Sequence, residues 1–371
     1  DSEGRRYFDG NASIWTNIHG HTHPAINAAI ERQLGEVAHT SYLGFTHPRA
    51  SELAERLVGL APEGLERVFF SDDGSTAMEV AMKMSLQYRQ QTGEDQRVRF
   101  VAFADGYHGD TMGAASLGGV ARFFERFRGF GVEVDFVKDV DELCELAADG
   151  VNAVVIEPLI QGVNEMRPWP GGMLRAVADW CRAQGVFLIL DEVMTGFGRT
   201  GTMFACEQEG VLPDFLCLAK GLTSGYLPLA ATLTTDRVYR AFLGDASRAF
   251  YYGHSFTANP LGCAAALASL DLFKRDDVLA GLPAKIARFT ELLDRLAASG
   301  GGIREIRQCG MIAGVEVGDG EGSRGAEVCL RARDYGLLTR PIRDTVVLMP
   351  PLCVTDEELT FAVEALARAI D

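Results

Sequence analysis

The sequence predicts an α/β protein whose large domain has a mostly parallel central sheet, followed by a smaller α+β domain. Short apolar runs alternate with helical segments from residue 68 to residue 220, and continuous apolar runs are typical of strands buried on both faces. From about Pro283 the order of helices and strands changes, and 371 residues with 47% apolar content can build both cores. We expect an N-terminal segment joining the small domain, the large domain and the small domain at 1–45, 46–275 and 276–371.

In chain order, amphipathic periodicity predicts the helices and continuous apolar runs predict the strands. The expected helices lie at 24–36, 48–60, 74–88, 173–184, 260–273, 284–298, 325–335 and 356–370. The expected strands lie at 68–70, 98–103, 151–156, 186–190, 214–219 and 311–317, with two more near Leu337 and Val346. Residues 118–131 are rich in glycine and aromatic side chains and are expected to form a loop.

Charge and cysteine content narrow the class of partner. The net charge is −16, from 35 basic and 51 acidic residues, which argues against nucleic acid and anionic membrane surfaces. No apolar run approaches the length of a membrane span, and Asp1 opens no signal-peptide pattern. The start at Asp1 rather than Met suggests that N-terminal residues are missing. The eight cysteines are scattered without a C-x-x-C pair, so we expect reduced thiols and a cytoplasmic location.

Three histidines at every second position, His19, His21 and His23, raise the question of a metal site. On a strand they would share one face, but Gly20 and Pro24 indicate a loop. No cysteine or carboxylate partner stands nearby in the sequence, so we expect no metal.

The most informative stretch runs from Val186 to Gly221. It contains two apolar runs, with Asp191 at the end of the first and Lys220 at the end of the second. A carboxylate and an amine at two strand ends suit pyridoxal phosphate (PLP), a cofactor with a basic ring nitrogen and an aldehyde. The lysine would attach the cofactor, and the acidic residue would keep its ring nitrogen protonated. A solvated strand end and a simple turn are the alternatives for the same residues.

The same stretch contains Gly196-Phe-Gly198-Arg-Thr-Gly201, which matches the G-x-G-x-x-G pattern of dinucleotide-binding loops. That site requires the glycines to open a full-length helix that leads to the next strand. Only residues 202–212 separate the motif from Pro213, and two acidic residues just before the glycines would face a pyrophosphate. The pattern therefore disfavours a dinucleotide site.

Two further stretches offer binding groups. Gly74 and Ser75 stand at an expected helix start, where free N–H groups and the helix dipole hold phosphate monoesters. An ordinary N-cap that includes Glu79 would explain the same residues. Tyr107 and His108 stand between glycines at a strand end and could stack on a flat ring. A tight turn with a buried tyrosine is the alternative.

Together these stretches resemble the class III, fold-type I PLP aminotransferases over essentially the whole chain. The most specific phrase is Asp191-Glu-Val-Met-Thr-Gly-Phe-Gly-Arg-Thr-Gly201 followed by Lys220. Further short motifs that support the resemblance lie at residues 18–20, 81–84, 106–111, 204–207, 221–223, 225–228 and 348–351. Met194, where many other members have Gln, favours the branch that aminates 7-keto-8-aminopelargonate in biotin biosynthesis.

The resemblance implies a role for each matching residue. Lys220 would carry PLP and move the proton, Asp191 would hold the pyridinium, and Tyr107 would stack on the ring. Ser255 would complete the phosphate site from the other subunit of a homodimer. The implied cofactor-binding residues are Gly74, Ser75, Tyr107, His108, Asp191, Lys220 and Ser255. The implied substrate-binding residues are Trp15, Tyr107, Arg199, Lys220, Gly253 and Arg340, with Arg340 as the bidentate partner of a carboxylate.

The chain departs from the resemblance where the substrate would lie. Ile14 precedes Trp15 where some members have two adjacent Trp, and Val347 stands where they have Tyr. The usual amino donor in this branch is S-adenosylmethionine, but a subgroup with an aliphatic residue before the Trp uses lysine, so the donor stays open. Another ω-aminotransferase acting on ornithine or 4-aminobutyrate, an aminomutase on the same scaffold and a non-catalytic homologue are the alternatives.

Overall fold

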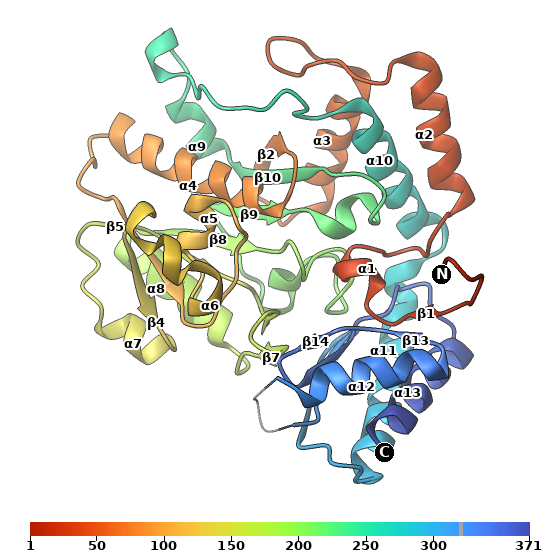
Figure 1. Ribbon diagram of the computed structural model, residues 1–371. Helices are drawn as coiled ribbons and strands as arrows, with labels where there is room; N and C mark the ends of the chain where they lie inside the picture. The colour runs from red at the N-terminus through yellow and green to blue at the C-terminus, as the bar shows by residue number, and fades with distance from the viewer. Residues whose placement is uncertain (319–321) are drawn as a thin grey trace.

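The computed structural model describes residues 1–318 and 322–371. A seven-stranded sheet lies at the centre of its larger part, in the order β2-β10-β9-β8-β5-β3-β4 (Figure 1). The five neighbours from β9 to β4 run parallel, whereas β10 runs antiparallel to both β2 and β9. The predicted mostly parallel sheet is therefore confirmed. The strands are β2 (Leu65–Ser71), β3 (Arg99–Phe103), β4 (Val134–Val137), β5 (Val151–Ile156), β8 (Phe187–Asp191), β9 (Phe215–Leu218) and β10 (Ala230–Thr235).

Strand β8 shows why its sequence is uninterruptedly apolar. Its side chains alternate between the two faces of the sheet, so Leu188 and Leu190 enter one buried cluster while Phe187 and Ile189 enter another. Helices cover both faces. Residues of α3, α8 and α10 belong to the first cluster, and residues of α4, α5 and α9 belong to the second.

Four helices have the predicted bounds, namely α2 (Pro24–Glu36), α3 (Pro48–Leu60), α8 (Met173–Gln184) and α13 (Asp356–Ile370). Helix α11 (Val278–Ala298) starts before the predicted position because it continues through Pro283. The other helices are α1 (Ala12–Trp15), α4 (Gly74–Gln91), α5 (Met112–Ser116), α6 (Ala121–Phe124), α7 (Val140–Glu145), α9 (Asp236–Ala241), α10 (Pro260–Arg275) and α12 (Arg324–Ala332). Short 3-10 helices are η1 (Glu125–Phe130), η2 (Ala205–Glu209), η3 (Lys220–Thr223), η4 (Ala246–Arg248) and η5 (Arg333–Tyr335).

Several elements differ from the sequence prediction. Strand β10 was not expected, because its sequence of alanines and threonines around one leucine lacks a continuous aliphatic run. The same holds for β11 (Glu305–Cys309), which is largely polar. The expected loop at 118–131 instead contains α6 and η1. In each case tertiary packing overrides a weak local preference.

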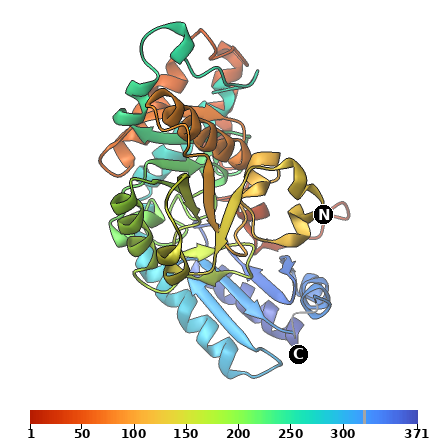
Figure 2. The same cartoon turned by 90° about the vertical axis from the view of Figure 1, so that its left-hand side faces the viewer.

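A second sheet of four antiparallel strands forms the smaller part, in the order β11-β12-β15-β14. Its remaining strands are β12 (Ile312–Glu316), β14 (Pro341–Ile342) and β15 (Thr345–Leu348), and α11, α12 and α13 lie against it (Figures 1 and 2). The N-terminal strand β1 (Phe8–Asp9) pairs in parallel with β13 (Leu337–Leu338), so the start of the chain lies beside its C-terminal part (Figure 1). A small hairpin pairs β6 (Ile160–Gln161) with β7 (Arg167–Pro168). The domain boundaries at residues 45 and 275 stay a prediction.

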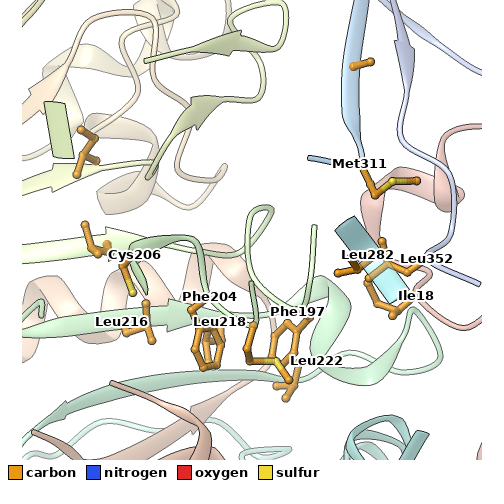
Figure 3. Packing of buried hydrophobic residues seen from close by; sticks show 14 of the residues in the cluster. Ile18, Phe197, Phe204, Cys206, Leu216, Leu218, Leu222, Leu282, Met311 and Leu352 are labelled. Atoms are coloured by element: carbon orange, nitrogen blue, oxygen red, sulfur yellow. The ribbon is translucent and has the colours of Figure 1, made fainter. Parts of the chain in front are cut away.

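The glycine-rich stretch after β8 forms turns rather than a helix start. Gly198 has a φ of 85°, and a Cβ there would lie 2.7 Å from Leu352 Cδ1 and 3.3 Å from Leu282 Cδ1. Leu282 and Leu352 gather with Ile18 and Met311 close to Phe197 in the core (Figure 3). Gly198 is thus explained by close packing between the two parts of the chain, not by a nucleotide.

The three N-terminal histidines go to three different partners. His19 Nε2 lies 3.1 Å from the Ser269 carbonyl, and His23 caps α2 by accepting from the Ala25 N–H. His21 pairs with Asp9 at 2.8 Å, so a carboxylate does lie nearby in the fold although none does in the sequence. Over residues 1–318 and 322–371, no three His, Cys, Asp or Glu side chains gather as metal ligands would. Within those ranges no helix has the length and apolarity to cross a membrane.

Candidate active site

A cavity of about 410 Å³ opens where the central strands end. It brings together Lys220, Asp191, Tyr107 and Glu157, each of which follows or ends a different parallel strand, as expected for a sheet of this type. The full lining is Trp15, Thr16, Asp72, Asp73, Gly74, Ser75, Tyr107, His108, Gly109, Glu157, Val163, Asp191, Val193, Met194, Ala219, Lys220, Thr223, Gly225, Tyr226, Leu227, Pro228 and Leu229.

Asp191 and Lys220 meet because β8 and β9 are parallel neighbours, with Asp191 opposite Cys217. The chain turns into η3 directly after β9, and Lys220 adopts a φ of 40° there. A left-handed lysine is a strained residue of the kind found at functional sites. Burial lowers the pKa of Lys220, although the charge of Asp191 opposes this shift. The environment thus favours the neutral, nucleophilic amine more than water does.

Asp191 is held at both of its oxygens. His108 Nδ1 lies 2.8 Å from one oxygen, and the Val193 N–H donates to the other at 3.1 Å. Burial alone would lower the pKa of His108, but the hydrogen bond and charge of Asp191 outweigh burial, and its pKa is raised. His108 therefore fixes the orientation of the Asp191 carboxylate through this hydrogen bond. Glu192, the next residue along, accepts the Ala205 and Cys206 N–H groups instead.

Glu157 connects two walls of the cavity. Its carboxylate accepts the N–H of Tyr107 at 3.2 Å and the N–H of Gly162 at 2.9 Å. Burial raises the pKa of Glu157 to about 7. Tyr107 is fixed at its other end, because its hydroxyl donates to Asp110 at 2.9 Å. Its ring meets Phe123 edge to face, with centroids 5.7 Å apart. The Tyr107 ring is therefore a positioned platform.

The N-terminus of α4 offers backbone donors to the same cavity. Asp73 is the N-cap and accepts the Thr76 N–H at 2.8 Å, within a complete capping box. Gly74 and Ser75 follow it and line the cavity. The first N–H groups of a helix have no intrahelical partner, so this 18-residue helix presents an anion seat. Glu79, the alternative cap, instead accepts the Gly113 and Ala114 N–H groups at the start of α5.

The remaining walls are largely apolar. Trp15 and Met194 belong to one buried cluster that also contains Val347. Val347 therefore backs the wall and does not line it, whereas Ile14 is half exposed. The segment Tyr226–Leu229 closes another side. Residues 225–228 are one of the motifs that carry the family resemblance. Sequence analysis nevertheless predicted no binding role for this segment.

Arg199 does not occupy the expected position. Its side chain is only 1% exposed and lies outside the cavity lining. It donates to the carbonyls of Pro350 and Asn17, both at 2.6 Å. Burial lowers the pKa of Arg199 to about 9. The predicted contact between Arg199 and a substrate stays a prediction, because its Nη1 and Nη2 donate to backbone carbonyls while its buried Nε has no partner among the described residues.

Three other predicted residues lie outside the lining of this cavity. Arg340 is exposed between β13 and β14, which leaves its guanidinium accessible. Gly253 and Ser255 belong to a loop before α10, and Ser255 is exposed. The neighbouring His254 pairs with Asp72 at 2.6 Å. This loop therefore borders the anion seat through Asp72 without entering the cavity.

The whole chain matches one known family. The class-III aminotransferase family matches residues 1–370. The chain belongs to the class-III aminotransferases. A protein of Geobacter sulfurreducens described as adenosylmethionine-8-amino-7-oxononanoate aminotransferase is 44% identical, over 100% of this chain and 89% of that protein.

Solved structures agree with this assignment to the class-III aminotransferases. The crystal structure of adenosylmethionine-8-amino-7-oxononanoate aminotransferase from Methanocaldococcus jannaschii is 38% identical with a TM-score of 0.96, over 100% of this chain and 90% of that one. An amine transaminase from an uncultivated Pseudomonas species, in its PLP-bound form, is 34% identical with a TM-score of 0.94, over 100% and 91%. The predicted α/β aminotransferase fold is confirmed.

The raised pKa of Glu157 predicts a pH dependence of stability. The folded protein holds this proton up to a pH of about 7, whereas the ordinary value is 4.5. The contribution of Glu157 to stability therefore falls as the pH rises from about 4.5 to about 7, and is constant above that range. Glu157→Gln should reduce this slope in the thermal midpoint. Glu192, whose pKa burial also raises to about 7, should maintain the rest of the slope.

The measurement is the thermal midpoint of wild type and variant at closely spaced pH values from about 5 to 8. Glu66→Gln, on an exposed glutamate of β2, is the control and should reproduce the wild-type profile. Parallel profiles for wild type and Glu157→Gln would show that Glu157 does not titrate in this range.

Proposed function

We propose that this chain is a PLP-dependent transaminase that transfers an amino group to 8-amino-7-oxononanoate, also called 7-keto-8-aminopelargonate. The observation that carries the proposal is the meeting of Lys220, Asp191 and the α4 anion seat in one cavity. Relatives up to 44% identical over the full chain are described as adenosylmethionine-8-amino-7-oxononanoate aminotransferases. The product of the proposed reaction would be 7,8-diaminopelargonate, a precursor in biotin biosynthesis.

The residues present fit PLP. The cofactor has an aldehyde, a basic ring nitrogen and a phosphate, and each has a matching group on one side of the cavity. Lys220 would attach the aldehyde, Asp191 would hold the protonated ring nitrogen, and the N–H groups of Gly74 and Ser75 would bind the phosphate. Tyr107 would stack on the ring. When bound, PLP supplies the electron sink that makes the substrate C–H bond acidic.

The protein's own residues would supply proton transfer and orientation. The lowered pKa of Lys220 favours a neutral amine, whose Nζ would take up the proton from the substrate carbon and later release it. His108 would keep Asp191 oriented by its 2.8 Å hydrogen bond. Glu157 would keep Tyr107 in position by accepting the backbone N–H of Tyr107. The apolar walls would exclude water from the reacting atoms.

Two features support 8-amino-7-oxononanoate as the amino acceptor, namely the apolar wall of the cavity and the exposed Arg340. Trp15, Val163 and Met194 line the cavity and suit the methylene chain of the acceptor. Arg340, exposed between β13 and β14, would bind its terminal carboxylate as a bidentate partner. The donor would be S-adenosylmethionine, as the relatives' names state for those proteins, or lysine. All eight cysteines are free, which supports a cytoplasmic location.

We further propose a homodimer whose subunits share the active site. Side chains exposed by 47–80% form an apolar patch beside the Gly253–Ser255 loop, and they are Leu43, Phe45, Tyr251 and Phe256. Their two segments lie together, because His39 and Phe256 have ring centroids 4.6 Å apart. A patch of this kind favours burial by another chain. In a second copy it would bring Ser255 to the neighbouring phosphate site.

Gly109→Ala should weaken PLP binding. Gly109 has a φ of 126°, and its Cβ would lie 2.6 Å from Ser75 Cβ and 2.8 Å from Ser75 Cα, in the proposed phosphate seat. We expect at least a tenfold loss of affinity, about 1.4 kcal/mol, in absorbance titrations of PLP into the apoprotein. Gly93→Ala is the matched control, because Gly93 also has a positive φ of 81° but open space around it. Equal PLP affinity of the two variants would contradict the seat.

The amino donor and acceptor can be tested as separate half-reactions. S-adenosylmethionine or lysine added to the PLP-loaded protein should convert its absorbance to that of the amine form of the cofactor, and 8-amino-7-oxononanoate should reverse this change. Lys220→Ala should lower turnover roughly a thousandfold or more, and Lys274→Ala, on an exposed lysine of α10, should not. A response only to ornithine, 4-aminobutyrate or simple amines would overturn the proposed substrate. It would indicate another ω-aminotransferase.

Phe256→Asp should dissociate the dimer and weaken PLP binding together. The charge would be placed in the proposed apolar interface, so the mass measured by light scattering should fall from dimer to monomer at micromolar concentration. Phe361→Asp, on an exposed aromatic of α13, is the control and should remain a dimer. A wild-type monomer that binds PLP and turns over normally would contradict the shared site.

A further inference from the structure

Trp15 borders the space beside the reactive amine. Its ring centroid lies 4.7 Å from Lys220 Nζ, within the range of a cation–π contact. The wall behind it is close-packed. A Cβ at Gly162 would lie 2.5 Å from Met194 Sδ and 3.4 Å from the Trp15 ring. The position of the indole therefore determines how much space a substrate has next to Lys220.

The backbone that carries Trp15 is strained. Ala12, Ser13 and Trp15 have φ values of 46°, 67° and 66°, which residues with a side chain rarely adopt. Such conformations persist only where surrounding contacts hold them. Asp9 holds the start of the segment by accepting the Ser13 N–H at 2.7 Å. Asn11 accepts the indole N–H of Trp15 at 3.0 Å.

Arg199 holds the other end of the segment. Its Nη2 donates to the carbonyls of Asn17 at 2.6 Å and Trp15 at 3.4 Å, and its Nη1 donates to the Pro350 carbonyl. Arg199 belongs to the turns that follow β8, the strand that ends in Asp191. One guanidinium thus connects the Asp191 loop, the wall segment and the chain after β15. Among the described residues Arg199 forms no ion pair, and its Nη1 and Nη2 donors serve these carbonyls, whereas its buried Nε has no hydrogen-bond partner.

We propose that Arg199 is a positioning residue, which holds the strained segment 12–17 so that Trp15 defines the substrate space beside Lys220. Arg199 itself does not touch the substrate. The inference rests on the proposed transamination, because only that reaction makes the space beside Lys220 a substrate site. It differs from the role expected from the sequence, in which Arg199 would contact the substrate directly.

The matched control is another buried arginine that ties backbone segments together away from the cavity. Arg89 is 4% exposed and donates to the carbonyls of Asn152 and Gly185. Arg89→Met removes a comparable buried guanidinium near the C-terminal end of α4. A general loss of stability should therefore follow from both Arg→Met variants, whereas a local effect on segment 12–17 should follow from Arg199→Met alone.

The test is hydrogen exchange of the PLP-loaded protein, read by mass spectrometry on peptides covering residues 10–18. The amides of Trp15, Thr16 and Asn17 donate within this segment. Their exchange should become at least about tenfold faster in Arg199→Met and stay unchanged in Arg89→Met. The KM for 8-amino-7-oxononanoate should rise about tenfold, with a smaller effect on kcat. Arg199→Lys, which keeps the charge but fewer donors, should give intermediate values and replaces Arg199→Met if that variant does not fold.

Two results would overturn the inference. A raised KM with unchanged exchange in residues 10–18 would mean that Arg199 acts on the substrate directly. Unchanged exchange together with unchanged kinetics would mean that Arg199 neither holds segment 12–17 nor affects the substrate space beside Lys220. Absence of activity toward 8-amino-7-oxononanoate would contradict the proposed function. The hydrogen-exchange measurement needs no substrate, so it would still decide whether Arg199 holds segment 12–17.

Discussion

The parallel pairing of β8 with β9 is the constraint on which the rest of the site depends. Parallel neighbours end at the same edge of a sheet, so this pairing alone brings the Asp191 carboxylate and the Lys220 amine to one cavity. Other groups are arranged around that pair. His108 holds the carboxylate by a hydrogen bond, and the N-terminus of α4 provides an anion seat in the same cavity.

Burial shifts the pKa values of the basic and acidic groups of the site in opposite directions. It lowers the pKa of Lys220 and raises that of Glu157, so both groups are brought closer to their neutral forms. The His108 hydrogen bond holds the Asp191 carboxylate in place. An amine that can exchange a proton, beside a carboxylate held in place by hydrogen bonds, is what the proposed chemistry requires. The same low-dielectric environment makes each unpaired polar group costly, which explains the backbone contacts of the Glu157 carboxylate and of the two Arg199 Nη atoms.

The residues of the proposed reaction were predictable because their signals are local. Asp191 and Lys220 follow apolar runs, and Gly74 and Ser75 stand at a helix start, so each could be read within a few residues. The supporting contacts were not, because they join residues far apart in sequence. Nothing near Arg199 indicates that its partners are the carbonyls of Asn17 and Pro350. For the same reason the assignment of Arg199 as a substrate ligand, which stays a prediction, came from its position within a motif and not from its environment. Strand β10 was missed because packing, not composition, defines it.

The central claim is that Lys220 is the covalent anchor of PLP in this cavity. Borohydride reduction of the PLP-loaded protein, followed by peptide mass spectrometry, tests it most directly, because reduction makes the lysine–cofactor bond permanent. The predicted result is one modified peptide, carrying the reduced cofactor on Lys220. Modification of another lysine, or bound cofactor that leaves Lys220 unmodified, would contradict the account.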